Sequence, residues 1–172
     1  FIARQYGSQL KTIEAAVDVN AEQKTRLFHK ACDRMITFQN LKVAVLGLAF
    51  KPGTDDLREA PSVDNIRLLL ESGADVYAYD PAAEENSRKL FPEGGIGKGH
   101  MSYVDSPELA LKGANICFIF TEWKQIKSLE ANQYKELMQT PLVYDGRNLY
   151  SPAYMEQGGV EYYGIGRQRR QK

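Results

Sequence analysis

The stretch at residues 42–61, KVAVLGLAFKPGTDDLREAP, decides the fold. Its first part, residues 42–50, is β-branched and almost continuously apolar, which is typical of a strand buried on both faces of a parallel sheet. A polar loop follows. Pro61 then suits the first turn of a helix predicted to run from residue 60 to about Gly73. Strand, loop and helix in this order predict one unit of an α/β fold.

The same alternation continues toward the end of the chain. Further strands are predicted at residues 75–80, 114–120, 141–145 and 160–163. Helices are predicted at residues 83–90, 107–112, 131–138 and 153–157, with a glycine-rich connection at 94–99. Such alternation implies right-handed crossovers and a doubly wound, Rossmann-like parallel sheet. Ligands of these sheets bind beyond the carboxyl ends of the strands.

A long helix is predicted before the sheet, at residues 8–38. Proline is absent there, and apolar or small residues recur three or four positions apart at Leu10, Ile13, Val17, Leu27, Ala31 and Phe38. Asn20 and Lys24 interrupt this seam. They are either polar positions tolerated in a helix pair or residues that fix the register of a dimer or face a ligand. We therefore divide the chain into a helical dimerisation segment, residues 1–39, and an α/β domain, residues 40–172.

Composition excludes several classes of partner. The 22 basic and 22 acidic side chains cancel, so there is no global charge to attract nucleic acid or an anionic membrane. No apolar stretch approaches the ~18 residues that a membrane span needs. Cys32 and Cys117 are expected to be buried free thiols rather than a disulfide or part of a metal site, which fits a cytoplasmic protein. The chain opens on Phe1 without methionine, and we expect it to be part of a longer protein.

The loop after residue 50 does not fit a dinucleotide cofactor well. A cofactor fingerprint needs G-x-G-x-x-G, but Gly47 is followed by leucine and alanine, and the next glycine is Gly53. Asp80 ends the following strand where a ribose-binding carboxylate would lie, yet Asp-Pro often simply ends a strand. Lys51 and Arg58 instead favour an anion such as a diphosphate near the start of the next helix. A solvated loop with internal ion pairs remains the alternative.

Three motifs together carry a resemblance to a known family. They are GLAFKPGTDDLREAP in residues 47–61, TEW in residues 121–123 and DGRN in residues 145–148, each after a predicted strand. In this order they resemble the carboxy-terminal, UDP-binding domain of the UDP-glucose/GDP-mannose dehydrogenase family. The first helix, with VNAEQ at residues 19–23, is similar to the family's long central helix. The resemblance covers essentially the whole chain.

The resemblance implies an activity and a cofactor. The family oxidises a sugar C6 alcohol to a carboxylate in two NAD-dependent steps, through a thioester on a catalytic cysteine. That cysteine and the NAD-binding domain precede the central helix, so neither Cys32 nor Cys117 takes the catalytic role. The resemblance therefore implies that this chain binds the UDP-sugar, that NAD is bound mainly by an absent domain, and that the chain alone is inactive.

Site residues follow from the resemblance, position by position. Phe50 and Lys51 resemble residues that border the nucleotide and reach the sugar-nucleotide pocket, and Arg147 resembles an arginine that contacts the UDP-sugar. Without the resemblance, the alternative interpretation of Arg147 is an arginine paired with Asp145 in a turn. Arg58 resembles an arginine that reaches toward NAD on the facing domain. No metal site is implied.

The motifs also favour one branch of the family. GLAFKPGTDD together with TEWKQIKSL at residues 121–129 favours the UDP-glucose branch. UDP-N-acetylmannosamine and GDP-mannose dehydrogenases are the neighbouring alternatives. A non-catalytic nucleotide-binding module and a pure dimerisation domain are alternatives of a different class. The expected partners are a UDP-sugar and, through the long helix, a second copy of the chain.

Overall fold

A seven-stranded sheet forms the centre of the computed structural model, which describes residues 10–167. The strands are β1 (Lys42–Leu46), β2 (Asp75–Tyr79), β3 (Gly94–Ile96), β4 (Gly99–Tyr103), β5 (Ile116–Ile119), β6 (Leu142–Asp145) and β7 (Glu161–Gly164). Their order is β3-β4-β2-β1-β5-β6-β7, and every neighbouring pair is parallel except β3 with β4. The predicted doubly wound α/β fold is confirmed.

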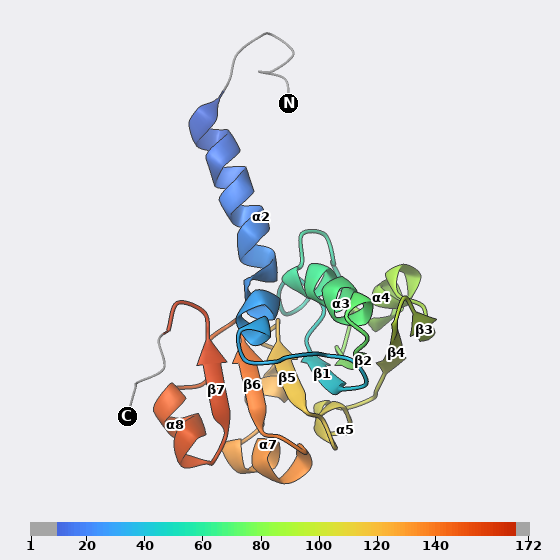
Figure 1. Cartoon of the computed structure of the whole chain (residues 1–172), viewed down its shortest axis with the longest axis vertical. Coiled ribbons are helices and arrows are strands. Elements are labelled where there is room, and N and C mark those ends of the chain that lie inside the picture. Colours follow the sequence, from blue (N-terminus) through green and yellow to red (C-terminus); the bar gives the residue numbers. More distant parts are fainter. Residues whose placement is uncertain (1–9, 168–172) are drawn as a thin grey trace.

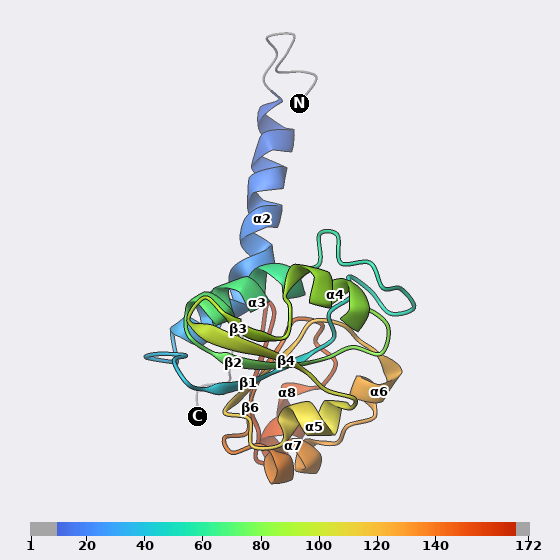
Figure 2. The same cartoon turned by 90° about the vertical axis from the view of Figure 1, so that its right-hand side faces the viewer.

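Helices cover both faces of this sheet (Figures 1 and 2). They are α2 (Lys11–Cys32), α3 (Pro61–Glu71), α4 (Glu84–Leu90), α5 (Pro107–Leu111), α6 (Lys124–Lys127), α7 (Ala131–Leu137) and α8 (Pro152–Gln157). Alternate residues of β1 serve the two faces, because successive side chains of a strand point to opposite sides. Val43 and Val45 belong to the core with α2 and α3, whereas Ala44 and Leu46 belong to the core with α5 to α8.

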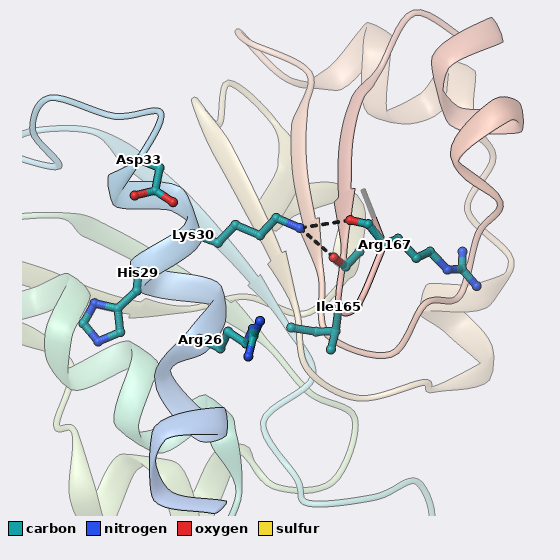
Figure 3. A pocket seen from close by; sticks show the side chains of 8 residues that line it. Arg26, His29, Lys30, Asp33, Ile165 and Arg167 are labelled. Carbon is teal, nitrogen blue, oxygen red and sulfur yellow. Dashed lines mark hydrogen bonds between the residues drawn. The ribbon is translucent and has the colours of Figure 1, made fainter. Parts of the chain in front are cut away.

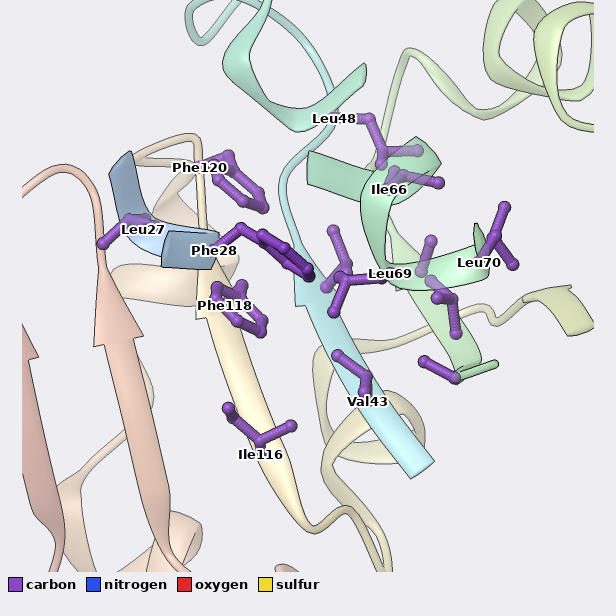
Figure 4. Packing of buried hydrophobic residues seen from close by; sticks show 14 of the residues in the cluster. Leu27, Phe28, Val43, Leu48, Ile66, Leu69, Leu70, Ile116, Phe118 and Phe120 are labelled. Atoms are coloured by element: carbon purple, nitrogen blue, oxygen red, sulfur yellow. The ribbon is translucent and has the colours of Figure 1, made fainter. Parts of the chain in front are cut away.

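The core on the α2 and α3 side is built from aliphatic and aromatic side chains (Figure 4). Phe28 of α2 lies over Phe118 of β5, and Leu27 points toward β6. Ile66 and Leu69 of α3 lie on the side of β1. Each of these side chains is at most 7% exposed. Burial of one such side chain stabilises a fold by roughly 1.5–3 kcal/mol, so this cluster fixes the base of α2 on the sheet.

The long helix α2 ends earlier than predicted. Its predicted start, at residue 8, lies outside the described residues. So do residues 1–9 of the predicted helical segment and residues 168–172 of the predicted α/β domain. The helix ends at Cys32 rather than residue 38, because the chain turns at residues 33 and 34 and folds back. Phe38 still meets the helix by stacking on Phe28, with ring centroids 5.2 Å apart. Phe38, the last residue of the predicted apolar seam, therefore packs against the helix without being part of it.

The amino-terminal half of α2 projects away from the sheet (Figures 1 and 2). Its seam residues Leu10, Ile13 and Val17 are 46%, 58% and 62% exposed, whereas Leu27 and Ala31 farther along are buried. In the described chain the helix is thus an arm whose base alone contacts the domain.

The predicted connection at residues 94–99 is wrong, since it forms a hairpin. β3 and β4 pair there in antiparallel fashion, and β4 continues parallel to β2. Gly99 permits this pairing, because a Cβ on it would lie 2.3 Å from the carbonyl oxygen of Ala74. Gly99 is therefore required for the close approach of two backbones, whereas nothing lies within 4 Å of a Cβ at Gly94 or Gly95.

The two cysteines are unpaired, as predicted, but only Cys117 is buried. Cys117 lies in β5 and is 0% exposed. The prediction of a buried Cys32 is wrong, because this last residue of α2 lies on the solvent side of the helix.

Candidate functional site

Asp80 organises the carboxyl end of the sheet. It follows β2 and is only 3% exposed. Its Oδ2 accepts the backbone N–H groups of Leu48 and Ala49 at 2.6 and 3.0 Å, and its Oδ1 accepts those of Ala82 and Ala83, both at 2.9 Å. Both oxygens are thus used within the chain. This supports the interpretation of Asp80 as a strand-end residue over a ribose-binding one.

The TEW motif is bound to the same centre. Thr121 donates its hydroxyl to the carbonyl oxygen of Ala49, and Trp123 donates its indole N–H to Asp80 Oδ2 at 2.9 Å. Gly47, at φ +85°, allows this contact, because a Cβ there would lie 2.5 Å from Thr121 Cβ. The motif's threonine and tryptophan therefore shape the loop after β1.

The loop after β1 also carries an internal ion pair. Arg58 Nε donates to both carboxylate oxygens of Asp56 at 3.0 and 3.1 Å, and Arg58 Nη2 donates to Oδ2 at 2.7 Å. These hydrogen bonds, with one from the Arg58 backbone N–H, lower the pKa of Asp56 to about 2. The loop is closed by the backbone bond from Phe50 N–H to the Asp56 carbonyl, 2.9 Å long. Arg58 is thereby held in one orientation although its side chain is 89% exposed.

Arg147 joins three strand ends. It follows β6, its Nε donates to the carbonyl oxygen of Phe120 at 2.8 Å, and its Nη2 donates to the carbonyl oxygen of Phe50. Its Nε also lies 3.1 Å from Glu122 Oε2. The turn interpretation of Arg147 fails for the side chain, since only its backbone N–H bonds to Asp145, at 2.7 Å.

The structure therefore brings part of the predicted site together. Phe50 and Arg147 are hydrogen-bonded, and Lys51 is the next residue along the chain. Lys51 is exposed and makes no hydrogen bond or ion pair within residues 10–167. Arg58 lies apart, in a hollow of about 600 Å³ lined by residues 54–58 with Asn86, Lys89 and Leu90.

The cavity at Arg147 is small. It has a volume of about 70 Å³ and is lined by Gln23, Lys24, Leu27, Pro61, Phe120, Gly146, Arg147 and Ile165. Sites for small organic ligands are usually about 300–1,000 Å³, so this cavity can hold water but not a nucleotide. A nucleotide bound by Phe50, Lys51 and Arg147 would therefore lie on the open edge of the domain.

A second large hollow, of about 520 Å³, lies between α2 and the chain that follows β7 (Figure 3). Arg26, His29, Lys30 and Asp33 line it together with residues 164–167. Lys30 Nζ donates to the carbonyl oxygens of Gly164 and Arg167 at 2.8 and 3.4 Å. The lysine thus anchors the end of the domain to α2. No motif in the sequence indicates this contact.

The ion pair of Asp56 with Arg58 is one that sequence reasoning had offered as an alternative for this loop. Sequence reasoning missed the other two contacts, since Glu122 lies against Arg147 and Asp80 fixes the loop that carries Phe50. The Asp-Pro step at residues 80–81 was the one local signal for any of them. Across residues 10–167, no group of three or more His, Cys, Asp or Glu side chains is arranged to bind a metal ion. None of the described helices is both long and apolar enough to cross a membrane.

Comparisons with known proteins agree with this geometry. The profile of the UDP-glucose/GDP-mannose dehydrogenase family, UDP binding domain, matches residues 44–152. The UDP-glucose 6-dehydrogenase of Pseudomonas aeruginosa is 42% identical over 168 residues, which are 97% of this chain and 37% of that protein. UDP-glucose 6-dehydrogenase YwqF of Bacillus subtilis is 36% identical over 166 residues, 96% of this chain and 36% of that protein.

A solved structure shows the same arrangement. The UDP-glucose dehydrogenase of Pyrobaculum islandicum superposes with a TM-score of 0.73 at 30% identity, covering 94% of this chain and 33% of that one. The chain thus spans about a third of the length of the relatives it matches. Since the family profile covers most of the sheet and all three strand-end motifs, the chain belongs to the UDP-glucose/GDP-mannose dehydrogenase family, of which it contains the UDP-binding domain.

Proposed function

We propose that this chain is the UDP-sugar-binding part of an NAD-dependent UDP-glucose 6-dehydrogenase. The reaction would oxidise UDP-glucose to UDP-glucuronate in two successive steps, with a cysteine thioester between them. The proposal is supported by relatives in the UDP-glucose branch that align over nearly the whole chain. A cytoplasmic location belongs to the same proposal.

The observation that carries the binding role is the bridge made by Arg147. It ties the end of β6 to the carbonyl groups of Phe50 and Phe120, so residues from separate strands meet at one edge. A guanidinium also presents donors that suit phosphate oxygens. Lys51, the residue after Phe50, adds a second positive charge on the loop whose Phe50 carbonyl Arg147 binds. Phe50 is 45% exposed, which would leave its ring available to border the nucleotide.

Arg58 would contact the cofactor, and NAD itself would be bound mainly by sequence outside this chain. NAD accepts the hydride when bound; this chain's contribution would be a guanidinium oriented by Asp56. The absence of a G-x-G-x-x-G turn after β1 supports this division of labour. On this proposal the chain alone does not turn over substrate.

Neither cysteine of the chain would serve as the nucleophile. Burial raises the pKa of Cys117 well above its ordinary value, so the reactive thiolate is suppressed. Partial burial, and then the charge of Asp33, raise the pKa of Cys32 as well.

The arm of α2 would pair with a second copy of the chain. Leu10, Ile13 and Val17 recur at helical spacing and are about half exposed or more, which leaves an apolar stripe in water. Sedimentation velocity of the chain would test this. A dimer that Val17→Asp converts to a monomer supports the proposal, and a parent chain that stays monomeric at high concentration contradicts it.

The binding role is tested in the longer enzyme by isothermal titration with UDP. Lys51→Ala and Arg147→Ala should each raise the dissociation constant for UDP about 10- to 100-fold, the effect of losing one charged hydrogen bond. Lys98→Ala is the matched control, because Lys98 is exposed between β3 and β4 at the far edge of the sheet. Unchanged affinity in both site variants would reject the proposed binding residues.

A further inference from the structure

Asn65 places its side chain within the hydrogen-bond ladder of another helix. It belongs to α3 and is 0% exposed. Its Nδ2 donates to the carbonyl oxygen of Lys24 at 2.7 Å, and its Oδ1 accepts the backbone N–H of Phe28 at 3.1 Å. Lys24 and Phe28 are four residues apart in α2, so their carbonyl and amide groups are the two partners of one helical hydrogen bond.

Such an insertion marks a place where the direction of a helix is set. A side chain that enters the ladder is one of the few identifiable causes of bending in a helix. Asn65 is itself fixed, since its Nδ2 also donates to the Pro61 carbonyl oxygen at 2.6 Å. The amide thus holds one turn of α2 against the first turn of α3.

A second contact reaches the same residue of α2. Lys24 Nζ lies 2.5 Å from Glu59 Oε2, and the lysine side chain is only 19% exposed. Glu59 has φ +60°, a left-handed conformation that is uncommon for residues other than glycine. Such conformations persist where surrounding contacts impose them, and the ion pair is one such contact. Glu59 directly follows Arg58, so the pair links α2 to the loop after β1.

These contacts lie where the arm meets the domain. Between Lys11 and Gln23 nearly every residue of α2 is exposed, and burial begins at Lys24 and becomes complete at Leu27 and Phe28. The side chain and the carbonyl of Lys24 are therefore held at the last point before the helix leaves the sheet.

We propose that Lys24, Glu59 and Asn65 form a clamp that positions α2 relative to the loop carrying Lys51 and Arg58. The clamp makes the helix and the loop one rigid body. It thereby sets the angle between the binding edge of this domain and the projecting arm of α2. The role in substrate binding rests on the proposed function, whereas the role in setting the helix direction does not.

The geometric part is tested on this chain by electron–electron resonance distances between two spin labels. Labels at Val17→Cys on the arm and Glu136→Cys on α7 are placed in a Cys32→Ser background and diluted with unlabelled chain. Asn65→Leu removes the inserted amide but fills its space, and the Lys24 carbonyl and Phe28 N–H can then bond to each other. The distance distribution should shift or broaden. Asn115→Leu is the control, because Asn115 also bonds a backbone N–H, that of Lys42, in another part of the domain.

Lys24→Met and Glu59→Gln provide independent variants if Asn65→Leu does not fold. Either variant should shift or broaden the distance distribution in the same way as Asn65→Leu. Distributions that superpose on the parent in all folded clamp variants overturn the proposal, even if these variants are less stable. A shift that Asn115→Leu reproduces overturns it too, because the effect would then be a general loosening.

The kinetic part is tested in the longer enzyme. Asn65→Leu should raise the KM for UDP-glucose and for NAD by roughly three- to tenfold, the range expected for the loss of one hydrogen bond, with a smaller change in kcat. A change in distance without a change in KM would retain the clamp and reject its part in binding. Loss of UDP affinity in Arg147→Ala is measured separately, so failure of the proposed function is distinguishable from failure of the clamp.

Discussion

The indole N–H of Trp123 donates to the carboxylate of Asp80 at 2.9 Å, across the end of β1. Trp123 follows β5 and Asp80 follows β2, and β1 lies between these two strands. The same Asp80 oxygen accepts the backbone N–H groups of Leu48 and Ala49. One buried carboxylate therefore fixes the ends of three neighbouring strands.

Loss of the Asp80 carboxylate should destabilise the fold strongly. Asp80→Ala leaves four backbone N–H groups and the indole N–H without their acceptor, in a place that water reaches poorly. We expect the free energy of unfolding to fall by at least about 3 kcal/mol in urea titrations. Asp64→Ala, which removes only the exposed pair with Arg67, should cost less than about 1 kcal/mol. Equal losses in the two variants would contradict this role of Asp80.

Two glycines of the strand-end loop should differ in their tolerance of alanine. Both have positive φ, +85° at Gly47 and +79° at Gly53, so each substitution carries backbone strain of about 1 kcal/mol. A Cβ at Gly47 would also lie 2.6 Å from the backbone nitrogen of Thr121, whereas nothing lies within 4 Å of one at Gly53. Gly47→Ala should therefore cost about 2 kcal/mol more than Gly53→Ala by thermal or chemical unfolding. A Gly53 variant that is the less stable of the two would argue against the described contact.

Asp56 should titrate below the usual range of a carboxyl group. Hydrogen bonds from Arg58 lower its pKa from 3.8 to about 2. Because the folded state favours the ionised form, the contribution of the pair to loop order is complete above about pH 4. It is lost as the pH falls through about 2. The carboxyl ¹³C shift of Asp56 against pH measures this, and Arg58→Gln should return the midpoint toward 3.8. A midpoint that Arg58→Gln does not move would show that the arginine is not the cause.

The two thiols should react differently. Cys32 is exposed and Cys117 is completely buried in β5, so a thiol reagent should modify Cys32 alone in the native chain. The raised pKa of Cys32 should make this reaction slow near neutral pH and faster as the pH rises. Counting modified thiols by mass spectrometry before and after unfolding checks the prediction. Modification of Cys117 in Cys32→Ser without denaturant would contradict the described burial.

Sequence reasoning located β1, β2, β5, β6 and β7 and missed the hairpin of β3 and β4 at one edge of the sheet. Runs such as residues 43–46 and 116–119 are buried on both faces and therefore apolar without interruption. The edge hairpin escaped detection because Gly94 and Gly99 indicate a turn by composition, and only the proximity of Ala74 reveals why Gly99 is there. The end of α2 escaped for a related reason, since Phe38 keeps the helical spacing but packs from outside the helix.

The meeting of two candidate site residues was predictable from their motifs. Arg147 and Phe50 belong to separate motifs, and the rule that strand ends share an edge was enough to expect them together. The clamp at Lys24 was not predictable, because it depends on which turn of α2 faces Asn65, and 41 residues separate the amide from its acceptor. Sequence reasoning treated Lys24 as an interruption of the apolar seam, either tolerated in a helix pair or there to fix a dimer register or face a ligand. The physical reason for that interruption is its ion pair with Glu59.

Asp80 holds the loop after β1 through backbone N–H groups, which leaves the side chains of that loop free to vary. Leu48 and Ala49 are held through their amide groups, so another residue of similar size at either position would follow the same path. The backbone that presents Phe50 and Lys51 is thus set by a residue about thirty positions away and not by the loop's own composition. Relatives that act on different nucleotide sugars could exchange residues in this loop without rebuilding the scaffold that displays them.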